Sequence, residues 1–434
     1  MSKNKKAEHQ TEPSVHEAVA PAWSEWVGQG GLDGPLRAFA AILDGAAASR
    51  SSLSALLRVR STTVSGWVAA MVRARLVTEL PSQPGTRGRP LGQLLVNPQR
   101  LAVTVLTVRS QALHAVTLNL LGQVLWHESA VLPPDGGNAA MNSLLRGLQQ
   151  RAAQRLPAGT VLAGTAYSLS GLVQAADARW VFVSRWPGIR NLALNDSVFP
   201  AGTTMHVVRN MDAQLRARGL RRGAAGQGER TLMLHWGYGI GAAFSAAGAG
   251  SGARIGDTAG FGEVGHWRLS GEAEPCRCGH QGCLETVAAL WSIGPALLGR
   301  DFDDAMDETR AADLLRGMAL TTHPVFARAL REMVLAVGNL CRVFFPTHLV
   351  ISGPFIENPG AWAAFTAAFS SEGLLMDLPL PRLEAQSAGY QLEQEGASMP
   401  LLLNGVMKLL AEAPASDAPA PKARRRVSRA APPR

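Results

Sequence analysis

Three features of the sequence predict an α/β protein of two parts. A helix–helix–helix–hairpin order over residues 31–98 is typical of a winged helix-turn-helix. The succession of strands and helices that starts at Leu101 is typical of a two-lobed, actin-like domain of the ribonuclease-H-like ATPase fold. One histidine and three cysteines between residues 266 and 283 predict a structural zinc loop in the second part.

Length and composition are those of a globular chain. The 434 residues are 47% hydrophobic and 17% charged, which predicts two or three domains and excludes a wholly disordered or fibrous protein. No stretch approaches the roughly 20 apolar residues of a membrane span. The first residues also lack the apolar core of a signal peptide. We therefore expect a cytoplasmic protein without a membrane partner.

The net charge of +9 is concentrated in two segments. Residues 50–100 carry +7 and residues 413–434 carry +5, which leaves about −3 for the rest of the chain. Polyanions are the natural partners of such segments. For the second segment, a solvated arginine-rich surface is the plainer interpretation. We divide the chain into a disordered arm (1–30), a winged helix-turn-helix (31–98), an actin-like domain (99–412) and a disordered basic tail (413–434).

The winged helix-turn-helix is predicted from apolar spacing and turn residues. A helix runs from Gly34 to Gly45, and Ser51 or Ser52 can cap a second helix. The third helix begins near Thr62 or Thr63. Strands at Leu76–Leu80 and Leu91–Val96 enclose the turn-rich tip PSQPGTRGRP.

DNA binding is the function that this segment predicts. The third helix begins with small hydroxyl side chains, which suit close approach to base edges and phosphates. The Arg-Gly-Arg of the tip is thin and cationic enough for a narrow minor groove. Any small three-helix domain with a hairpin is the plainer alternative. The expected DNA contacts are Arg58, Arg60, Ser61, Thr62, Thr63, Ser65, Arg87, Gly88 and Arg89.

The actin-like domain is predicted from a β-β-β-α-β order. Strands are expected at Leu101–Val108, Ala112–Leu120, Val124–Glu128 and Thr160–Ser168, with a helix over 139–155 before the last of them. A second half begins near Thr231 with strands at Thr231–Trp236 and Gly239–Ser245. Its later elements are helices around 285–300, 309–319 and 324–342, a strand at His348–Ser352 and a helix over 399–412.

The most informative stretch is GEVGHWRLSGEAEPCRCGHQGCLE, residues 262–285. Its four predicted metal ligands are His266, Cys276, Cys278 and Cys283. One imidazole and three thiolates complete a tetrahedral zinc site of the structural kind and leave no position for a reacting water. His280 is a spare candidate inside the loop, whereas Cys341 lies in an apolar helix and is expected to be a buried hydrophobe.

The same stretch resembles a known family. Glu-x-Gly-His at 263–266 followed by Cys-x-Cys-Gly-x-x-Gly-Cys-x-Glu at 276–285 is similar to the signature of the ROK family of repressors and sugar kinases. The resemblance covers about residues 35–412. The tip sequence RGRP at 87–90, directly before the second domain, resembles the family's transcriptional regulators, a group that includes N-acetylglucosamine and xylose repressors.

The resemblance implies a sugar site between the two lobes. Its residues would be Gly171, Asp212, Glu263, His266 and Glu285. Met211 stands where the family has an asparagine, and Ser170 stands where it has a proline. Carboxylates accept hydrogen bonds from sugar hydroxyls, and a zinc-fixed imidazole is oriented for one more.

The segments that would bind nucleotide depart from the kinase pattern. Residues 103–111, VTVLTVRSQ, contain no glycine and no acid where a kinase of the family has Asp-x-Gly-x-Thr. Gly237-Tyr238-Gly239 resembles a second phosphate loop, with tyrosine in place of threonine. We therefore expect no enzyme activity and no ATP.

The leading interpretation is a sugar-responsive repressor. It would bind operator DNA as a homodimer or a dimer of dimers, contain one Zn²⁺ per chain, and sense a small sugar or sugar phosphate. Two alternatives stay open. One is a sugar kinase with a fused DNA-binding domain, and the other is a regulator that has lost sugar sensing and answers to a protein partner.

Overall fold

The structure is a computed structural model, and it describes residues 23–28, 34–80, 92–109, 111–131, 136–222, 228–246, 262–374, 378–387 and 389–413. None of the helices in these ranges combines the length and the hydropathy of a membrane-spanning segment.

The predicted winged helix-turn-helix is present. Its elements are α2 (Gly34–Leu43), α3 (Arg50–Leu57), α4 (Ser61–Arg73) and the antiparallel strands β1 (Val77–Leu80) and β2 (Gln93–Val96). The cap of α3 is Ser49 rather than Ser51 or Ser52, because its side chain accepts the backbone N–H of Ser52. The tip of the wing lies outside the described residues.

One arginine fixes the helices and the hairpin in their relative positions. Arg50, the first residue of α3, donates to both carboxylate oxygens of Glu79 in β1, at 2.8 and 2.7 Å. Its remaining Nη1 donates to the carbonyl of Ser65 in α4. A bidentate pair of this kind sets geometry as well as energy, so helix α4 is held against both neighbours.

The first lobe is built on a five-stranded sheet with the order β10-β6-β3-β4-β5. Its parallel part is β10, β6 and β3, and β4 and β5 extend it antiparallel. The elements are β3 (Leu101–Arg109), β4 (Ala112–Asn119), β5 (Val124–Val131), α5 (Asn138–Gln154), β6 (Val161–Leu169) and β10 (Met205–Arg209). A small sheet that the sequence pattern does not predict joins this lobe: β7 (Leu172–Gln174), β8 (Arg179–Phe182) and β9 (Arg190–Ala193).

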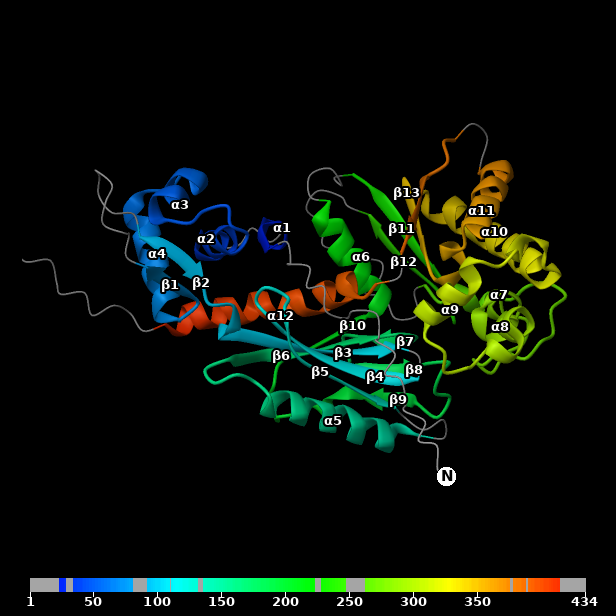
Figure 1. The fold of residues 1–434 in the computed structure, drawn as a ribbon, viewed down its shortest axis with the longest axis horizontal. Coiled ribbons are helices and arrows are strands. Elements are labelled where there is room, and N and C mark those ends of the chain that lie inside the picture. The colour runs from blue at the N-terminus through cyan, green and yellow to red at the C-terminus, as the bar shows by residue number, and fades with distance from the viewer. Residues whose placement is uncertain are drawn as a thin grey trace, which may run out of the picture.

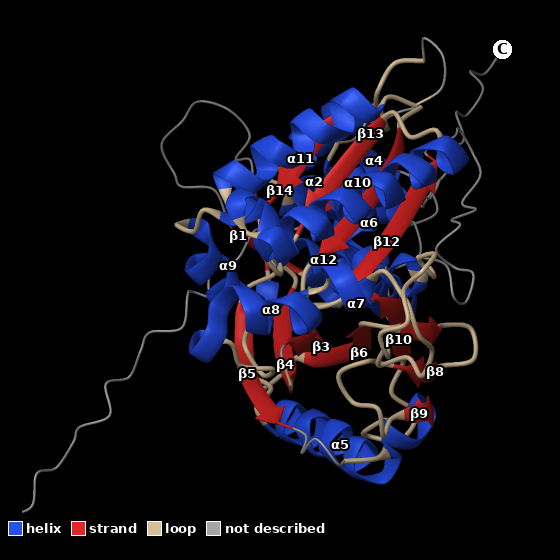
Figure 2. Ribbon diagram, turned by 90° about the vertical axis from the view of Figure 1, so that its right-hand side faces the viewer, coloured by secondary structure: helices blue, strands red, loops and turns tan. Residues whose placement is uncertain are grey.

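The second lobe is built on a four-stranded sheet with the order β12-β11-β13-β14. Its strands are β11 (Arg230–Trp236), β12 (Ile240–Ala246), β13 (His348–Ser352) and β14 (Arg382–Gln386). Its helices are α7 (Glu285–Ala288), α8 (Leu290–Leu298), α9 (Glu308–Arg316), α10 (Pro324–Phe344) and α11 (Pro359–Glu372). Figure 2 shows the two sheets one above the other, with α5 on the outer face of the lower one.

Two helices connect the lobes and the winged helix. Helix α6 (Asn210–Arg221) packs on the second lobe through Met211 and Leu215 and on the first lobe through Ala213 and Leu220. Helix α12 (Gln391–Glu412) returns the chain to the first lobe and runs beside α6 toward the winged helix (Figure 1). It begins eight residues before the expected Met399.

The end of the predicted arm is ordered, which corrects our division of the chain. Residues Trp23–Gly28 form helix α1, and Trp23, Trp26 and Val27 are buried. These side chains belong to one core cluster that joins the winged helix to the first lobe. The boundary near residue 30 is therefore wrong for α1, because its apolar face is covered by both parts. Residues 1–22 and the tail from 414 lie outside the described residues.

Candidate functional site

A cavity of about 210 Å³ lies between the two lobes. The first lobe contributes the carboxyl ends of β3, β6 and β10, and the second lobe contributes the β11–β12 turn and the start of α9. Four of the five expected sugar-site residues are in its lining: Gly171, Glu263, His266 and Glu285. The fold therefore brings together residues that are up to 114 positions apart in the sequence.

Glu263 and His266 face the cavity from one short turn. Glu263 precedes the 3₁₀ turn Val264–His266, and its Oε2 lies 3.8 Å from Nε2 of His266. Burial raises the pKa of the Glu263 carboxyl, although the neighbouring His266 and Arg209 act against that shift. A carboxylate and an imidazole side by side offer one acceptor and one donor to a polyhydroxylated ligand.

Glu285 is fixed by donors on two sides. It is the first residue of α7, and its Oε1 accepts the backbone N–H of Ile240 at 2.9 Å. Its Oε2 accepts Nε1 of Trp291 at 3.2 Å. The carboxylate is therefore locked in one orientation against the β11–β12 turn, and each oxygen keeps further acceptor capacity for a ligand.

Gly171 closes the site from the first lobe. It has a φ of +80°, and a Cβ atom there would lie 2.4 Å from the carbonyl oxygen of Phe182. Only glycine fits this contact and this conformation. The turn after β6 can thus press against β8, which places Phe182 in the cavity wall.

Asp212 is not brought together with the other four residues. It lies in the first turn of α6 and accepts Nε and Nη2 of Arg209, at 3.0 and 3.2 Å. In the described part of the chain, the cavity lining contains Arg209 and Met211 but not Asp212. Arg209, which binds the Asp212 carboxylate, itself lines the cavity and also donates to the carbonyl of Ala242.

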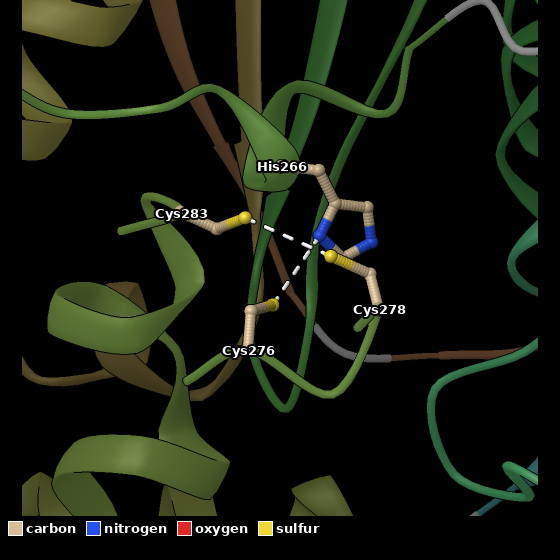
Figure 3. A group of neighbouring side chains, drawn as sticks. All are labelled: His266, Cys276, Cys278 and Cys283. Carbon is tan, nitrogen blue, oxygen red and sulfur yellow. Dashed lines mark hydrogen bonds between the residues drawn. The ribbon is translucent and has the colours of Figure 1, made fainter. Parts of the chain in front are cut away.

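The four predicted metal ligands form one cluster (Figure 3). One ligand atom from each of His266, Cys276, Cys278 and Cys283 lies within 4.8 Å of the others, so the group could hold a metal ion. Nδ1 of His266 is 3.6 Å from Sγ of Cys276, so Nδ1 faces the sulfurs while Nε2 faces Glu263. Burial raises the pKa of the Cys276 and Cys283 thiols. A divalent cation is what such a buried thiol group needs in order to ionise.

The cavity has a second half at the Gly237–Gly239 turn, whose contacts sequence reasoning did not find. Oε1 of Glu308, the first residue of α9, accepts the backbone N–H of Tyr238 at 2.6 Å. Its Oε2 pairs with Nε2 of His235 at 2.9 Å. Burial alone would raise the pKa of Glu308, but His235, Arg185 and the Tyr238 N–H lower it to about 2. The turn that resembles a phosphate loop therefore already binds an anion, which is the chain's own carboxylate.

Two arginine–tyrosine stacks line the same half. The Arg185 guanidinium lies 3.5 Å above the ring of Tyr238, and that of Arg109 lies 3.2 Å above the ring of Tyr390. The Tyr238 hydroxyl donates to Asp304 at 3.0 Å. Arg185 comes from the first lobe and Tyr238 from the second, so this stack joins the lobes across the cavity. No local motif marks these partners, because they are far apart in the sequence.

The predicted DNA contacts that fall in the described residues are mostly exposed. Arg58 is exposed at the end of α3, Arg60, Ser61, Thr62 and Thr63 are exposed at the start of α4, and Ser65 is half-buried. Arg87, Gly88 and Arg89 lie outside the described residues.

Comparison with known proteins identifies the family to which this fold and cavity are similar. A sequence model of the ROK family matches residues 114–389. A putative xylose repressor from Caldicellulosiruptor sp. (strain Rt8B.4) is 24% identical over 332 residues, which cover 71% of this chain and 80% of the relative. A glucokinase from Halalkalibacterium halodurans is 27% identical, over 50% of this chain and 69% of the relative. The crystal structure of a ROK-family transcriptional regulator, a homologue of the E. coli Mlc protein, aligns with a TM-score of 0.62 at 20% identity, over 84% of this chain and 94% of that one.

Proposed function

The chain belongs to the ROK family, and from this premise we propose that it is a sugar-responsive, DNA-binding repressor without enzymatic activity. One observation carries the proposal: the cleft presents Glu263, His266 and Glu285 to a ligand in one half, and in the other half the Tyr238 N–H is bound by the chain's own Glu308. Such a cleft would bind a sugar, whereas the Tyr238 N–H that would meet a phosphoryl donor is already bound by a carboxylate.

The DNA-binding part of the proposal rests on the winged helix. Exposed hydroxyls at the start of α4 and the basic residues around them would meet base edges and phosphates. The repressor relative is consistent with this role. Two half-sites are read by a two-fold dimer in most regulators of this geometry, so we propose a homodimer on operator DNA.

The sugar-binding part rests on the lobe that holds the metal cluster. The ligands of a sugar would be Glu263, His266 and Glu285, with the Gly171 turn on the opposite wall. We propose that Zn²⁺ is the metal at His266 and the three cysteines. Because all four positions are protein ligands, the metal would hold the loop and orient the His266 imidazole, and would not activate water.

The similarity to a glucokinase makes a sugar kinase the alternative function. Two contacts argue against it. Asp212, the residue that would deprotonate a sugar hydroxyl, is engaged by Arg209, and the Tyr238 N–H is occupied by Glu308. Phosphoryl transfer depends on positioned groups around the phosphate, and here those groups are used internally.

The test is operator binding with and without sugar. A duplex selected by the protein from a random-sequence pool is titrated by fluorescence anisotropy, alone and with D-xylose, D-glucose or glucose 6-phosphate, with no nucleotide present. We expect one of these ligands to change the DNA affinity roughly 5- to 150-fold. Glu263→Gln should weaken that ligand about 10-fold or more, since hydrogen bonds to a charged group are removed.

Glu274→Gln is the matched control, because Glu274 is exposed on the same loop. It should respond like the parent. A parent protein that binds the duplex but ignores every sugar would contradict the sugar-sensing part of the proposal and favour a regulator that answers to a protein partner. Equal responses of Glu263→Gln and the parent would place the sugar elsewhere.

The wing provides a separate test of the DNA interface. Arg87→Ala combined with Arg89→Ala should weaken binding and reduce the slope of log affinity against log salt by about 0.9 for each phosphate that the two arginines neutralise. Thr63→Ala should change which sequence is preferred and leave the slope near the parent value. Parent-like binding by the double variant across a salt series would show that the wing does not contact DNA.

A further inference from the structure

The helices α6 and α12 both begin at the cleft. Asn210 and Met211, the first residues of α6, line the cavity. Glu393, in the first turn of α12, lines it as well and accepts the hydroxyl of Ser168 at 2.7 Å. A ligand that changes the closure of the lobes therefore acts on the first turn of each helix.

The two helices are in direct backbone contact. A Cβ atom at Gly396 of α12 would lie 1.9 Å from the carbonyl oxygen of Ala213 in α6. No side chain larger than hydrogen fits between them. Because α6 also packs on the sheet of the second lobe through Met211 and Leu215, a movement of that lobe is passed to α6 and from α6 to α12.

Glu395 lies between the cleft residue Glu393 and the contact at Gly396, and its side chain is only 3% exposed. Its Oε2 accepts Nε of Arg221, the last residue of α6, at 2.7 Å. Its Oε1 accepts Nε1 of Trp26 in α1 at 3.2 Å. One buried carboxylate thus joins α6, α12 and α1.

Helix α1 is in turn part of the core of the winged helix. Trp23 packs edge-on against Phe39 of α2, with ring centroids 5.7 Å apart. The same core cluster contains Val64, Val68 and Met71, the buried face of the recognition helix α4. Figure 1 shows α1 between the winged helix and α6.

We propose that Glu395 is the positioning residue that couples the cleft to the DNA-binding helices, through Trp26. This rests on the proposed function, since it needs a sugar response to transmit. Because an unpaired buried charge is costly, the Glu395 carboxylate keeps its partners, and the Trp26 N–H that it accepts ties α1 to α6 and α12. Closure of the lobes then moves α1 and, with it, the position of α4.

The test compares two tryptophans of the same helix. Trp26→Phe removes the N–H that Glu395 accepts, and Trp23→Phe removes the N–H that the backbone carbonyl of Leu120 accepts at 2.9 Å. Both substitutions replace a buried indole by a smaller phenyl ring. Any general loss of packing of α1 should therefore occur in both variants. For each variant, the affinity for the selected duplex is measured with and without the sugar to which the parent responds, and the sugar affinity is measured with and without the duplex.

Trp26→Phe should reduce the sugar-induced change in DNA affinity roughly 2- to 30-fold, and should reduce the DNA-induced change in sugar affinity by the same factor. Trp23→Phe should keep both. If Trp26→Phe does not fold, Glu395→Gln is compared with Trp23→Phe in the same way.

Parent-like coupling in Trp26→Phe would overturn the proposal, and so would an equal loss in both tryptophan variants, because that loss would belong to α1 in general. A parent that responds to no sugar overturns the proposed function and this coupling together, whereas a responsive parent with unaffected variants overturns only the coupling.

Discussion

The two halves of the cleft differ in what their polar groups face. On the side of the His–Cys cluster (His266, Cys276, Cys278 and Cys283), Glu263, His266 and Glu285 line the cavity and come from a short stretch of sequence. On the side of the Gly237–Gly241 turn, the backbone N–H of Tyr238 and the imidazole of His235 are both taken by Glu308. Glu285 also accepts the N–H groups of Ile240 and Trp291, so the halves differ chiefly in the Tyr238 N–H and the His235 imidazole, which Glu308 engages.

This difference bears on whether one cavity can bind a ligand without catalysing a reaction. Catalysis needs groups that are free to act on the transition state. Here the carboxylate nearest to a catalytic role, Asp212, faces Arg209, and the anion position of the turn is filled. This difference is consistent with the proposal that the chain binds a sugar and does not transfer a phosphoryl group.

The largest effect is expected from breaking the His–Cys cluster. Cys278→Ser removes one of the four ligands of the metal cluster. The metal content should fall from about one per chain to well below one, because even loss of an outer-shell partner costs about 10- to 100-fold in affinity. Metal analysis of purified protein measures this. The sugar response should disappear with the metal, since His266 loses its orientation.

Cys341→Ala is the control for that variant, because Cys341 is buried in α10 away from the cluster. It should keep a full complement of metal. A metal content well below one in the parent itself would contradict the assignment of the cluster as a metal site.

A smaller effect is expected in the other half, and it should depend on pH. The folded pKa of Glu308 is about 2, below its ordinary 4.5, so its ionic contribution to stability is present above about pH 4.5 and is lost as the pH falls toward 2. Burial opposes a charge on His235, but Glu308 outweighs it and raises the His235 pKa above 6.5. The contribution of His235 is therefore full below pH 6.5 and is lost as the pH rises through the raised value.

Both partners are charged between about pH 4.5 and 6.5. Glu308→Gln should lower the free energy of unfolding by about 1–3 kcal/mol in that window, and by less at pH 3 and at pH 9, as measured by urea unfolding. Glu128→Gln, which breaks the exposed pair with Arg151, should cost less than about 1 kcal/mol at every pH. A Glu308→Gln difference that is constant from pH 5 to 9 would show that the contact is not ionic.

Elements with clear apolar spacing could be predicted from the sequence, and short or mixed ones could not. The winged helix and most strands of both sheets follow the predicted order. The start of α12 escapes prediction because Glu393, Glu395 and Gly396 interrupt its apolar pattern, and all three are buried for reasons outside the helix. Helix α1 escapes it although Trp23, Trp26 and Val27 have helical spacing, because six residues are too few for a periodic signal.

The motif located residues that line the cavity and missed the contacts that modify the site. Glu263, His266 and Glu285 lie where a shared local signature implies. That Asp212 would face Arg209 depends on how one side chain turns within the first turn of α6. That Glu308 would fill the turn at Tyr238 depends on a contact across 70 positions of sequence, which spacing does not reveal.

The core that α1, the winged helix and the first lobe share also bears on how such regulators can be recombined. A fragment ending near residue 98 would expose the apolar faces that Leu101, Val103 and α12 cover in the intact chain. The winged helix is therefore not an independent unit that can be separated at residue 98 without exposing apolar surface. A chimera that joins this winged helix to another sensor domain would have to include α1 and the C-terminal end of α12. Otherwise the new domain would have to cover the same apolar surface.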